Sequence, residues 1–420
     1  MVSDVILLGL FLATACGIMV RPFGLGPGWV ATGAVFLATA AGLVTPPEVV
    51  AAVGRTGDVL LFFAGLLLLA ASAARAGLFG LLLRLVDSWA GGSPRRLLVA
   101  VAVGTALVTV ALSNDAAVLL FAPAVLRLVR GRRLPPGRFI LAMAFMANSA
   151  SLVLPMGNPV NLLILDRAGV SAAGYVAALS LPALAGVALL LALLALVAGR
   201  ARWPATPVPP PGPAEPADSP DRRLVAALAL ILVALAVVDA AAALRGAPLG
   251  PPTATAGAVA AVAVLVRERG RLAWLRDGAM WSLLPLILGL SVLAAGLGGR
   301  GPVGAVVLHL SDHATTAAQA TVVGMATAGL AALLNNLPAA VLMTTGLQAA
   351  HHLHQLAMPV IAGADLGPNL APMGSLSTLL LFGVARRQGL APQWRRFWRW
   401  ALVAGPVSAV PVLLLVAHGH

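Results

Sequence analysis

The sequence predicts an all-α polytopic membrane protein made of two inverted-topology repeats, and three observations lead to this fold class. The 420-residue chain is 60% hydrophobic and only 10% charged. Several apolar runs reach the roughly 20 residues that a helix needs to cross a bilayer. A stretch near the end of the chain also repeats a stretch from its first half, and both copies lie inside hydrophobic segments.

The repeat is a gapless match between residues 147–162 and 364–379. The aligned pairs include Pro155-Met156-Gly157 on Pro372-Met373-Gly374, Asn148 on Asp365, Asn158 on Ser375 and Asn161 on Thr378. A second polar break precedes each copy, at 113–115 and at 335–338. Apolar segments interrupted by Pro and Gly at matching places in two halves are typical of secondary transporters, whose site forms where the broken helices meet. The repeat therefore predicts that the chain moves a small solute across a membrane.

The charge pattern excludes several other classes of protein. The formal net charge is +13, and all 27 basic residues are Arg, clustered between the apolar runs. Such clusters follow the positive-inside rule of membrane proteins, so no nucleic acid partner is predicted. A chain without Lys has no P-loop lysine, and the single cysteine, Cys16, excludes a multi-thiolate metal site within one chain. We therefore predict no cofactor, no resident metal and no enzymatic activity, in a multi-pass protein of a bacterial inner membrane.

The first repeat is expected to cover residues 1–202. Its expected helices are 4–20, 28–45, 58–82, a broken helix 138–167 and a returning helix 171–199. The stretch 97–126 has Arg on both flanks, so it should enter from the cytoplasm and return there as a re-entrant hairpin. Its tip would be Ser113-Asn114-Asp115.

A Pro-rich cytoplasmic linker, 203–221, is expected to join the first repeat to a second at 222–420. The second repeat's expected elements are helices 223–243, 252–266 and 278–298, a hairpin 314–350 that opens outward, a broken helix 356–385 and a final helix 397–417. These elements give about ten transmembrane helices and two hairpins. Both termini are then external and nearly all arginines face the cytoplasm.

The four polar breaks are the candidate site. Backbone freed by a break in a helix stays satisfied at membrane depth only where it faces protein or a water-lined cavity, so we expect the breaks to converge near the midplane. The predicted substrate-binding residues are Ser113, Asn114, Gly157, Asn158, Asn161, Asn335, Asn336, Gly374, Ser375 and Thr378. Intramembrane carboxylates are costly and typical of proton or ion pathways, which assigns Asp365, and secondarily Asp115, to energy coupling.

A structural alternative stands beside this functional interpretation. Ser, Asn and Gly also pack helices together and hydrogen-bond between them, and a carboxylate can accept hydrogen bonds from a helix end. For Asp58, which we expect at a helix start, capping is the favoured role.

The polar motifs resemble those of a known family. Residues 363–380, which include Gly363-Ala364-Asp365-Leu366-Gly367-Pro368, resemble the C-terminal signature of the ArsB-type arsenite permeases, the arsenical pump membrane proteins of the ion transporter superfamily. Residues 112–117 and 335–339 resemble two further motifs of that family. The resemblance implies export of trivalent arsenite and antimonite driven by proton uptake, and, in some organisms, association with a soluble ArsA ATPase. Asn369 is a departure, because a lysine is expected there in the family.

Arsenite chemistry agrees with this resemblance. At neutral pH arsenite is mainly As(OH)3, an uncharged triol that a ring of carboxamides, hydroxyls and backbone groups suits. The same oxygens also suit Na⁺. A sodium/proton antiporter or an organic-anion carrier of the same superfamily is therefore the alternative. A third hypothesis, a membrane scaffold or sensor without transport, is disfavoured by four polar breaks within lipid-spanning segments.

Overall fold

The computed structural model describes residues 2–21, 24–203, 222–270, 273–276, 281–297, 309 and 317–418. Within these ranges every regular element is helical, which confirms the predicted all-α membrane fold, while the inverted relation of the two repeats stays a prediction. The expected linker 203–221 lies outside the described residues apart from Trp203, as do parts of the expected helix 278–298 and of the hairpin 314–350.

The first half of the chain forms a series of long helices and short helical pieces. They are α1 (Val2–Val20), α2 (Pro27–Ala40), α3 (Pro46–Arg75), α4 (Leu78–Ala90), α5 (Pro94–Ala111), α6 (Asn114–Ala116), η2 (Ala117–Phe121), α7 (Ala122–Gly131), α8 (Pro136–Ala150), η3 (Pro155–Gly157), α9 (Pro159–Ala168), α10 (Ala172–Tyr175), η4 (Val176–Ser180) and α11 (Leu181–Arg200). Many of these helices begin with Pro, whose missing N–H costs nothing in the first turn.

The second half repeats this alternation of long and interrupted helices. Its elements are α12 (Arg222–Leu244), α13 (Gly250–Arg267), η6 (Ala273–Arg276), α15 (Leu283–Leu297), α17 (Ala317–Leu334), α18 (Asn336–Ala349), α19 (Leu353–Leu366), η7 (Gly367–Asn369), α20 (Leu376–Arg387) and α21 (Trp394–His418). Across the described residues, 6 helices are long and apolar enough to cross a membrane by themselves. The broken and shorter helices add to these, and the total of about ten spans stays a prediction.

The expected helix 58–82 is wrong at both ends. Thr45 and Glu48 form a capping box that starts α3 twelve residues earlier, at Pro46. The helix ends at Arg75, before Gly77, whose φ of 86° lies in the left-handed region. A separate helix, α4, begins directly after Gly77.

Asp58 is consequently in the middle of α3 and does not cap its own helix. Its Oδ1 accepts a hydrogen bond of 3.0 Å from the backbone N–H of Gly250, the first residue of α13. The carboxylate therefore caps a different helix, 192 residues away in the sequence. The prediction that Asp58 caps the helix that it begins is wrong, and only the tertiary structure shows that it caps α13.

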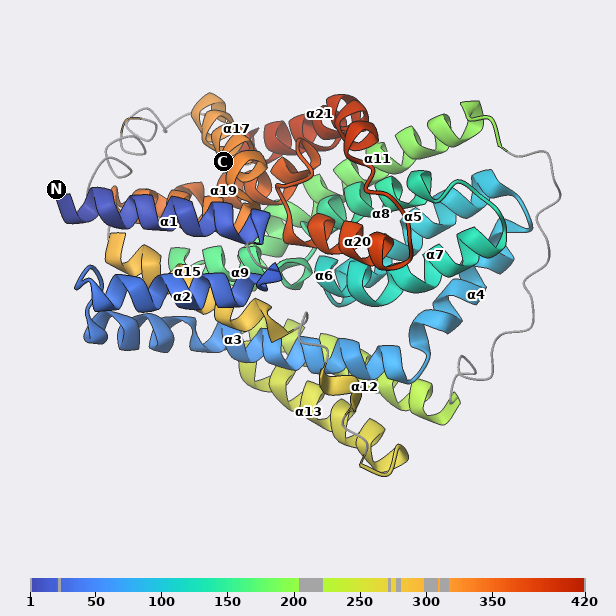
Figure 1. The fold of residues 1–420 in the computed structure, drawn as a ribbon, viewed down its shortest axis with the longest axis horizontal. Coiled ribbons are helices and arrows are strands. Elements are labelled where there is room, and N and C mark those ends of the chain that lie inside the picture. The colour runs from blue at the N-terminus through green and yellow to red at the C-terminus, as the bar shows by residue number, and fades with distance from the viewer. Residues whose placement is uncertain are drawn as a thin grey trace.

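Helices α3 and α13 lie side by side along the lower edge of the molecule (Figure 1). Gly65 and Gly257 meet where they cross, and a β-carbon on either glycine would collide with the backbone of the other helix. Such close approach of two backbones is the usual role of small residues between membrane helices. On the other side of α3, α15 packs against both α2 and α3.

The two broken helices, α8–η3–α9 and α19–η7–α20, pack against each other at the centre of the fold. Helix α9 contacts α19, while α8 contacts both η7 and α20. Around them, α11 packs on α21, α17 on α19, and α5 on α8. The interrupted segments are therefore enclosed by protein, as satisfaction of their backbone groups requires.

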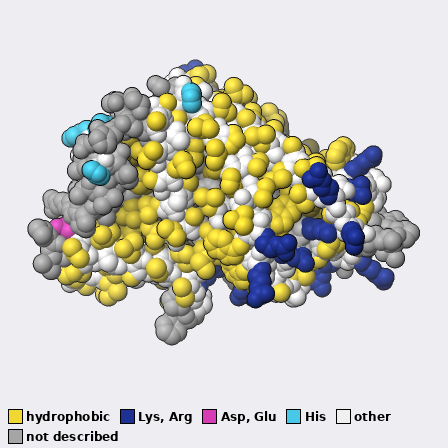
Figure 2. All heavy atoms as spheres, turned by 90° about the horizontal axis from the view of Figure 1, so that it is seen from above, with side chains coloured by type: hydrophobic (Ala, Val, Ile, Leu, Met, Phe, Trp, Pro, Cys, Tyr) yellow, Lys and Arg dark blue, Asp and Glu magenta, His cyan; other side chains and the backbone are white. Residues whose placement is uncertain are grey.

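Charge is distributed unevenly over the surface. Arginine side chains gather toward one end of the molecule in Figure 2, and the visible histidines lie toward the other. Both chain termini lie on the side away from the arginines (Figure 1). This distribution favours the predicted orientation, with an arginine-rich cytoplasmic face and external termini.

Candidate functional site at the four helix breaks

Each predicted polar break is present as an interruption of a helix. Helix is lost at 112–113, between α8 and α9, at Asn335 and between η7 and α20. Asn335 has a φ of 80°, which is rare for a residue with a side chain. Its Nδ2 donates to the carbonyl of Met373 at 3.1 Å, and the N–H of Asn336 donates to the carbonyl of Gly374 at 2.8 Å. Two breaks of the second half are thus joined through their backbones.

All four breaks contribute to one small central cavity of about 20 Å³. Its lining residues are Asn114, Asp115, Asn158, Pro159, Val160, Leu283, Leu286, Asn335, Asn336, Leu337, Ser375, Leu376 and Ser377. A volume of this size holds about one water molecule. Little space is therefore left at the point where the breaks meet.

Asp365 lies beside this cavity and is completely buried. It accepts hydrogen bonds from Ser151 Oγ at 2.9 Å, from Asn158 Nδ2 at 2.5 Å and from Asn161 Nδ2 at 3.1 Å. Asn161 also donates to the hydroxyl of Tyr175, which in turn donates to the carbonyl of Leu152 at 2.8 Å. A buried carboxylate with three donors is well compensated in this position. Since Asn158 also lines the cavity, it connects the carboxylate to the cavity wall.

Asn148 is the centre of a second polar cluster. Its Nδ2 donates to Asn369 Oδ1 at 3.2 Å and to Thr378 Oγ1 at 3.3 Å, and its Oδ1 accepts from Ser377 Oγ at 3.4 Å. Asn369 donates further to Ser149 and Ser408. The departure from lysine therefore puts a buried carboxamide where a cation is expected in the family, and it joins α8, η7 and α21.

The predicted site residues separate into three groups. Those that line the cavity are Asn114, Asp115, Asn158, Asn335, Asn336 and Ser375. Asn161, Thr378 and Asp365 belong to the neighbouring hydrogen-bond clusters. Ser113, Gly157 and Gly374 form the third group. Ser113 Oγ accepts a hydrogen bond of 3.1 Å from the N–H of Ala116, Gly157 packs closely on the backbone of Ser151, and the carbonyl of Gly374 accepts from the N–H of Asn336.

The sequence prediction missed several members of these clusters, namely Asn148, Ser149, Ser151, Tyr175, Asn369 and Ser377. Two of them left signals. Asn148 aligns with Asp365 in the repeat, and Tyr175 is the single tyrosine of the chain and is 0% exposed. Ser151 and Ser377 carry no such signal in the sequence, because their role depends on the approach of the other broken helix.

Some polar groups here have no hydrogen-bond partner among the described residues. They are Oδ1 of Asn114 and Oδ1 of Asn161. Buried polar groups are rarely left in this state unless they serve a ligand, an ion or water. Asn114 lines the cavity, so one of these unused acceptors belongs to its wall.

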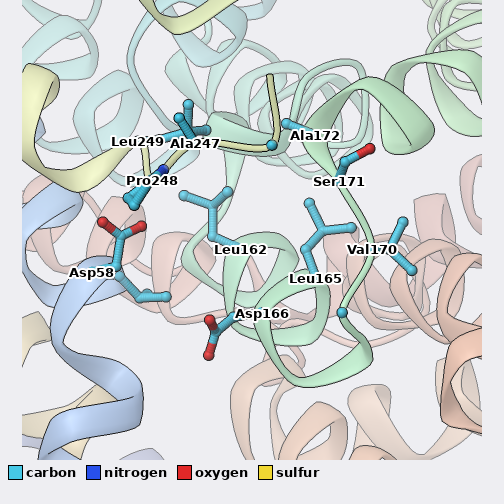
Figure 3. A pocket seen from close by; sticks show the side chains of 13 residues that line it. Asp58, Leu162, Leu165, Asp166, Val170, Ser171, Ala172, Ala247, Pro248 and Leu249 are labelled. Atoms are coloured by element: carbon cyan, nitrogen blue, oxygen red, sulfur yellow. The ribbon is translucent and has the colours of Figure 1, made fainter. Parts of the chain in front are cut away.

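A second, larger pocket of about 440 Å³ lies between α3, α9 and residues 246–249 (Figure 3). Asp58 and Asp166 lie on its wall among apolar side chains. It shares no lining residue with the central cavity. Among the described residues no group of three or more His, Cys, Asp or Glu side chains is placed to hold a metal ion.

Known proteins with similar sequences are membrane transporters. The model of the family described as "Citrate transporter" matches residues 10–385. The arsenical pump membrane protein of Escherichia coli K12 is 26% identical over 97% of this chain and 96% of its own length. The inner membrane protein YbiR of the same strain is 35% identical over 132 residues, or 31% of this chain and 34% of its own.

Among solved structures, the YdaH transporter of Alcanivorax borkumensis matches with a TM-score of 0.54 and 16% identity, over 87% of this chain and 84% of that one. This similarity shows a shared fold. The similarity to arsenical pump membrane proteins confirms the resemblance that the motifs predicted.

Proposed function

The chain belongs to the citrate transporter family, and from this premise we propose that it exports trivalent arsenite, and antimonite, in exchange for protons. The family and the relatives are secondary transporters, so the protein is a multi-pass inner-membrane transporter and not an enzyme. The choice of solute rests on one observation: seven polar side chains at the four helix breaks surround a single cavity.

The chemistry of that cavity suits a small neutral triol. Carboxamides both donate and accept hydrogen bonds, as As(OH)3 does, and the unused acceptor of Asn114 and the carboxylate of Asp115 match its hydroxyl protons. A chain with one cysteine does not provide three thiolates, which would hold arsenic too tightly for release. Hydrogen bonding to oxygen gives the weaker binding that a carrier needs.

Loading the site requires a change of conformation. The cavity volume of about 20 Å³ is that of one water molecule, and As(OH)3 is larger. The helices that line the cavity must therefore separate for the solute to enter from one face and leave toward the other, as alternating access demands.

Two carboxylates are placed to couple this exchange to protons. Asp115 lies in the cavity wall, where a solute hydroxyl and a proton would compete for it. Asp365 acts through Asn158, whose amide it orients toward itself. Protonation of Asp365 would weaken its hydrogen bond with the Asn158 amide, and it would thereby change which groups of Asn158 face the cavity. Coupling would then arise from the differing affinity of the two protonation states for the solute.

An organic-anion carrier is the second candidate, because the family carries the description "Citrate transporter". The cavity lining contains the Asp115 carboxylate and no arginine or histidine, which disfavours a multiply charged anion. Sodium, which prefers oxygen ligands, remains an alternative coupling ion.

Everted membrane vesicles test the proposal, because export then appears as accumulation. Vesicles that contain the full chain should accumulate arsenite and antimonite when their interior is acidified, and a protonophore should abolish this. Asn158→Ala and Asp115→Asn should each reduce the rate at least about tenfold, equivalent to about 1.4 kcal/mol of transition-state or binding free energy. Thr255→Ala, at an exposed position on α13, is the matched control and should leave the rate unchanged. If the vesicles accumulate citrate or sodium but not arsenite, the proposed solute is wrong and the accumulated one takes its place.

A further inference from the structure

A third cavity, of about 550 Å³ and with a mainly apolar lining, lies beside the C-terminal end of α1. Its lining comes from the α1–α2 connection, α2, the start of α15 and α20. The residues are Arg21, Gly26, Pro27, Gly28, Trp29, Thr32, Trp281, Ser282, Pro285, Leu376 and Leu380. Leu376 also lines the central cavity, so the two cavities share a wall.

Arg21 is the single charged residue of this lining. It has a φ of 53°, in the left-handed region that a residue with a β-carbon seldom adopts. Its Nη2 is buried and makes no hydrogen bond to any described residue. Burial, and the positive charge of Arg387, lower the pKa of Arg21. A buried guanidinium nitrogen without a hydrogen-bond partner is costly, and an anion would remove that cost.

The remaining wall is apolar and aromatic. Trp281 donates its indole N–H to the carbonyl of Leu275, which leaves its ring faces for contact. Trp29 is 71% exposed, so the cavity is open on the side of α2. A cation at one end of an apolar, partly open cavity is complementary to a molecule with an anionic head and an apolar tail.

We propose that this cavity binds an amphipathic anion, with its phosphate or carboxylate head at Arg21 and its apolar tail against Trp29, Trp281 and Pro285. The position of the cavity gives such binding a consequence. The occupant would contact α2 and α15 on one side and α20 on the other, and α20 begins at Leu376, in the wall of the central cavity. It would therefore resist relative movement of α20 and α2. This inference is independent of which solute the chain transports.

Two sources supply this chemistry: a membrane phospholipid and a free fatty acid. Native mass spectrometry of the full chain in a neutral detergent distinguishes them, with phosphatidylglycerol added in one series and dodecanoate in the other. We expect at least one of the two to bind the wild-type chain at one molecule per chain. If neither binds, the proposal is overturned, whatever the outcome of the arsenite assay.

Four variants test the assigned geometry. Arg21→Gln should weaken binding at least tenfold, while Arg21→Lys should retain part of it. Thr32→Phe keeps the charge but fills the tail region, and should weaken binding to a similar degree. Arg95→Gln changes an exposed arginine at the start of α5 and should bind as wild type does. Equal binding by Arg21→Gln and wild type, or equal loss in Arg95→Gln, would show that the cavity is not the site.

In vesicles, the transport rate should depend on phosphatidylglycerol content in the wild-type chain and much less in Arg21→Gln. A dependence of the same size in both would contradict the inferred effect on transport.

Discussion

Asp365 and Asn148 occupy equivalent positions in the two repeated stretches, and each hydrogen-bonds to the segment that follows the break in the other stretch. Asp365 accepts from Asn158 and Asn161, while Asn148 donates to Thr378, the counterpart of Asn161. The two broken helices are thus held together by a reciprocal exchange of side-chain contacts. One half contributes a carboxylate and the other a carboxamide, so this pair contains one ionisable group.

The first prediction concerns that carboxylate. Asp365→Asn should fold, because an amide of the same shape retains an acceptor for Asn158 or Asn161, but arsenite accumulation should no longer respond to an imposed pH gradient. The measurement is the initial uptake rate in everted vesicles at several internal pH values. Asp365→Ala is the comparison: it removes the acceptor that Ser151, Asn158 and Asn161 share, leaves the Asn158 amide unsatisfied at a cost of about 1–3 kcal/mol, and should lower the melting temperature. An Asp365→Asn protein that still transports with the wild-type pH response would refute the coupling role.

The second prediction concerns the crossing of α3 and α13. Gly65→Ala should destabilise the protein by about 1–3 kcal/mol, because the new β-carbon would collide with the backbone at Thr253. Gly57→Ala, eight residues earlier in the same helix, has no atom within 4 Å of the added carbon. It should be neutral or stabilising, by up to about 1 kcal/mol. Thermal unfolding of the two purified variants checks this, and equal melting temperatures would contradict the close approach.

The third prediction concerns the cap that α3 provides to α13. Asp58→Ala should cost about 1 kcal/mol, since the N–H of Gly250 loses its acceptor. Asp58→Asn retains an acceptor oxygen and should therefore keep most of the stability that Asp58→Ala loses. The readout is again the melting temperature in detergent. A loss in Asp58→Asn as large as that in Asp58→Ala would indicate that charge, and not the hydrogen bond, is what matters.

The fourth prediction concerns topology. In a background where the exposed native Cys16 is replaced by Ala, cysteines introduced as Val2→Cys and Gly419→Cys should react with an impermeant thiol reagent added to intact cells. Gly131→Cys, at the arginine-rich C-terminal end of α7, should react only after the membrane is opened. If both terminal cysteines are protected in intact cells, the predicted orientation is inverted.

Much of the fold followed from local sequence. Runs of apolar residues long enough to span lipid predicted an all-helical membrane protein, and Pro, Gly and Asn within such runs predicted breaks at 113–115, 155–159, 335–338 and 365–374. The structure has them at 112–113, between α8 and α9, at Asn335 and between η7 and α20. These features are local, because a helix in lipid fails wherever its own residues do not sustain it. The boundaries of α3 were harder to predict, since Thr45 of its capping box was expected to end the preceding helix and Glu48 to lie in a loop.

Only part of the candidate site could be predicted from the sequence. The sequence by itself determined that Asn114, Asp115, Asn158, Asn335, Asn336 and Ser375 lie at helix interruptions, and the tertiary structure decided that they surround one cavity. It also decided that Asp58 caps α13 and that Asp365 bonds to Ser151, Asn158 and Asn161. The physical reason is the range of the interactions. Hydrophobicity and helix breaking act within a few residues, whereas a buried hydrogen bond joins whichever donors and acceptors packing brings within about 3 Å, here over 200 residues apart in the chain.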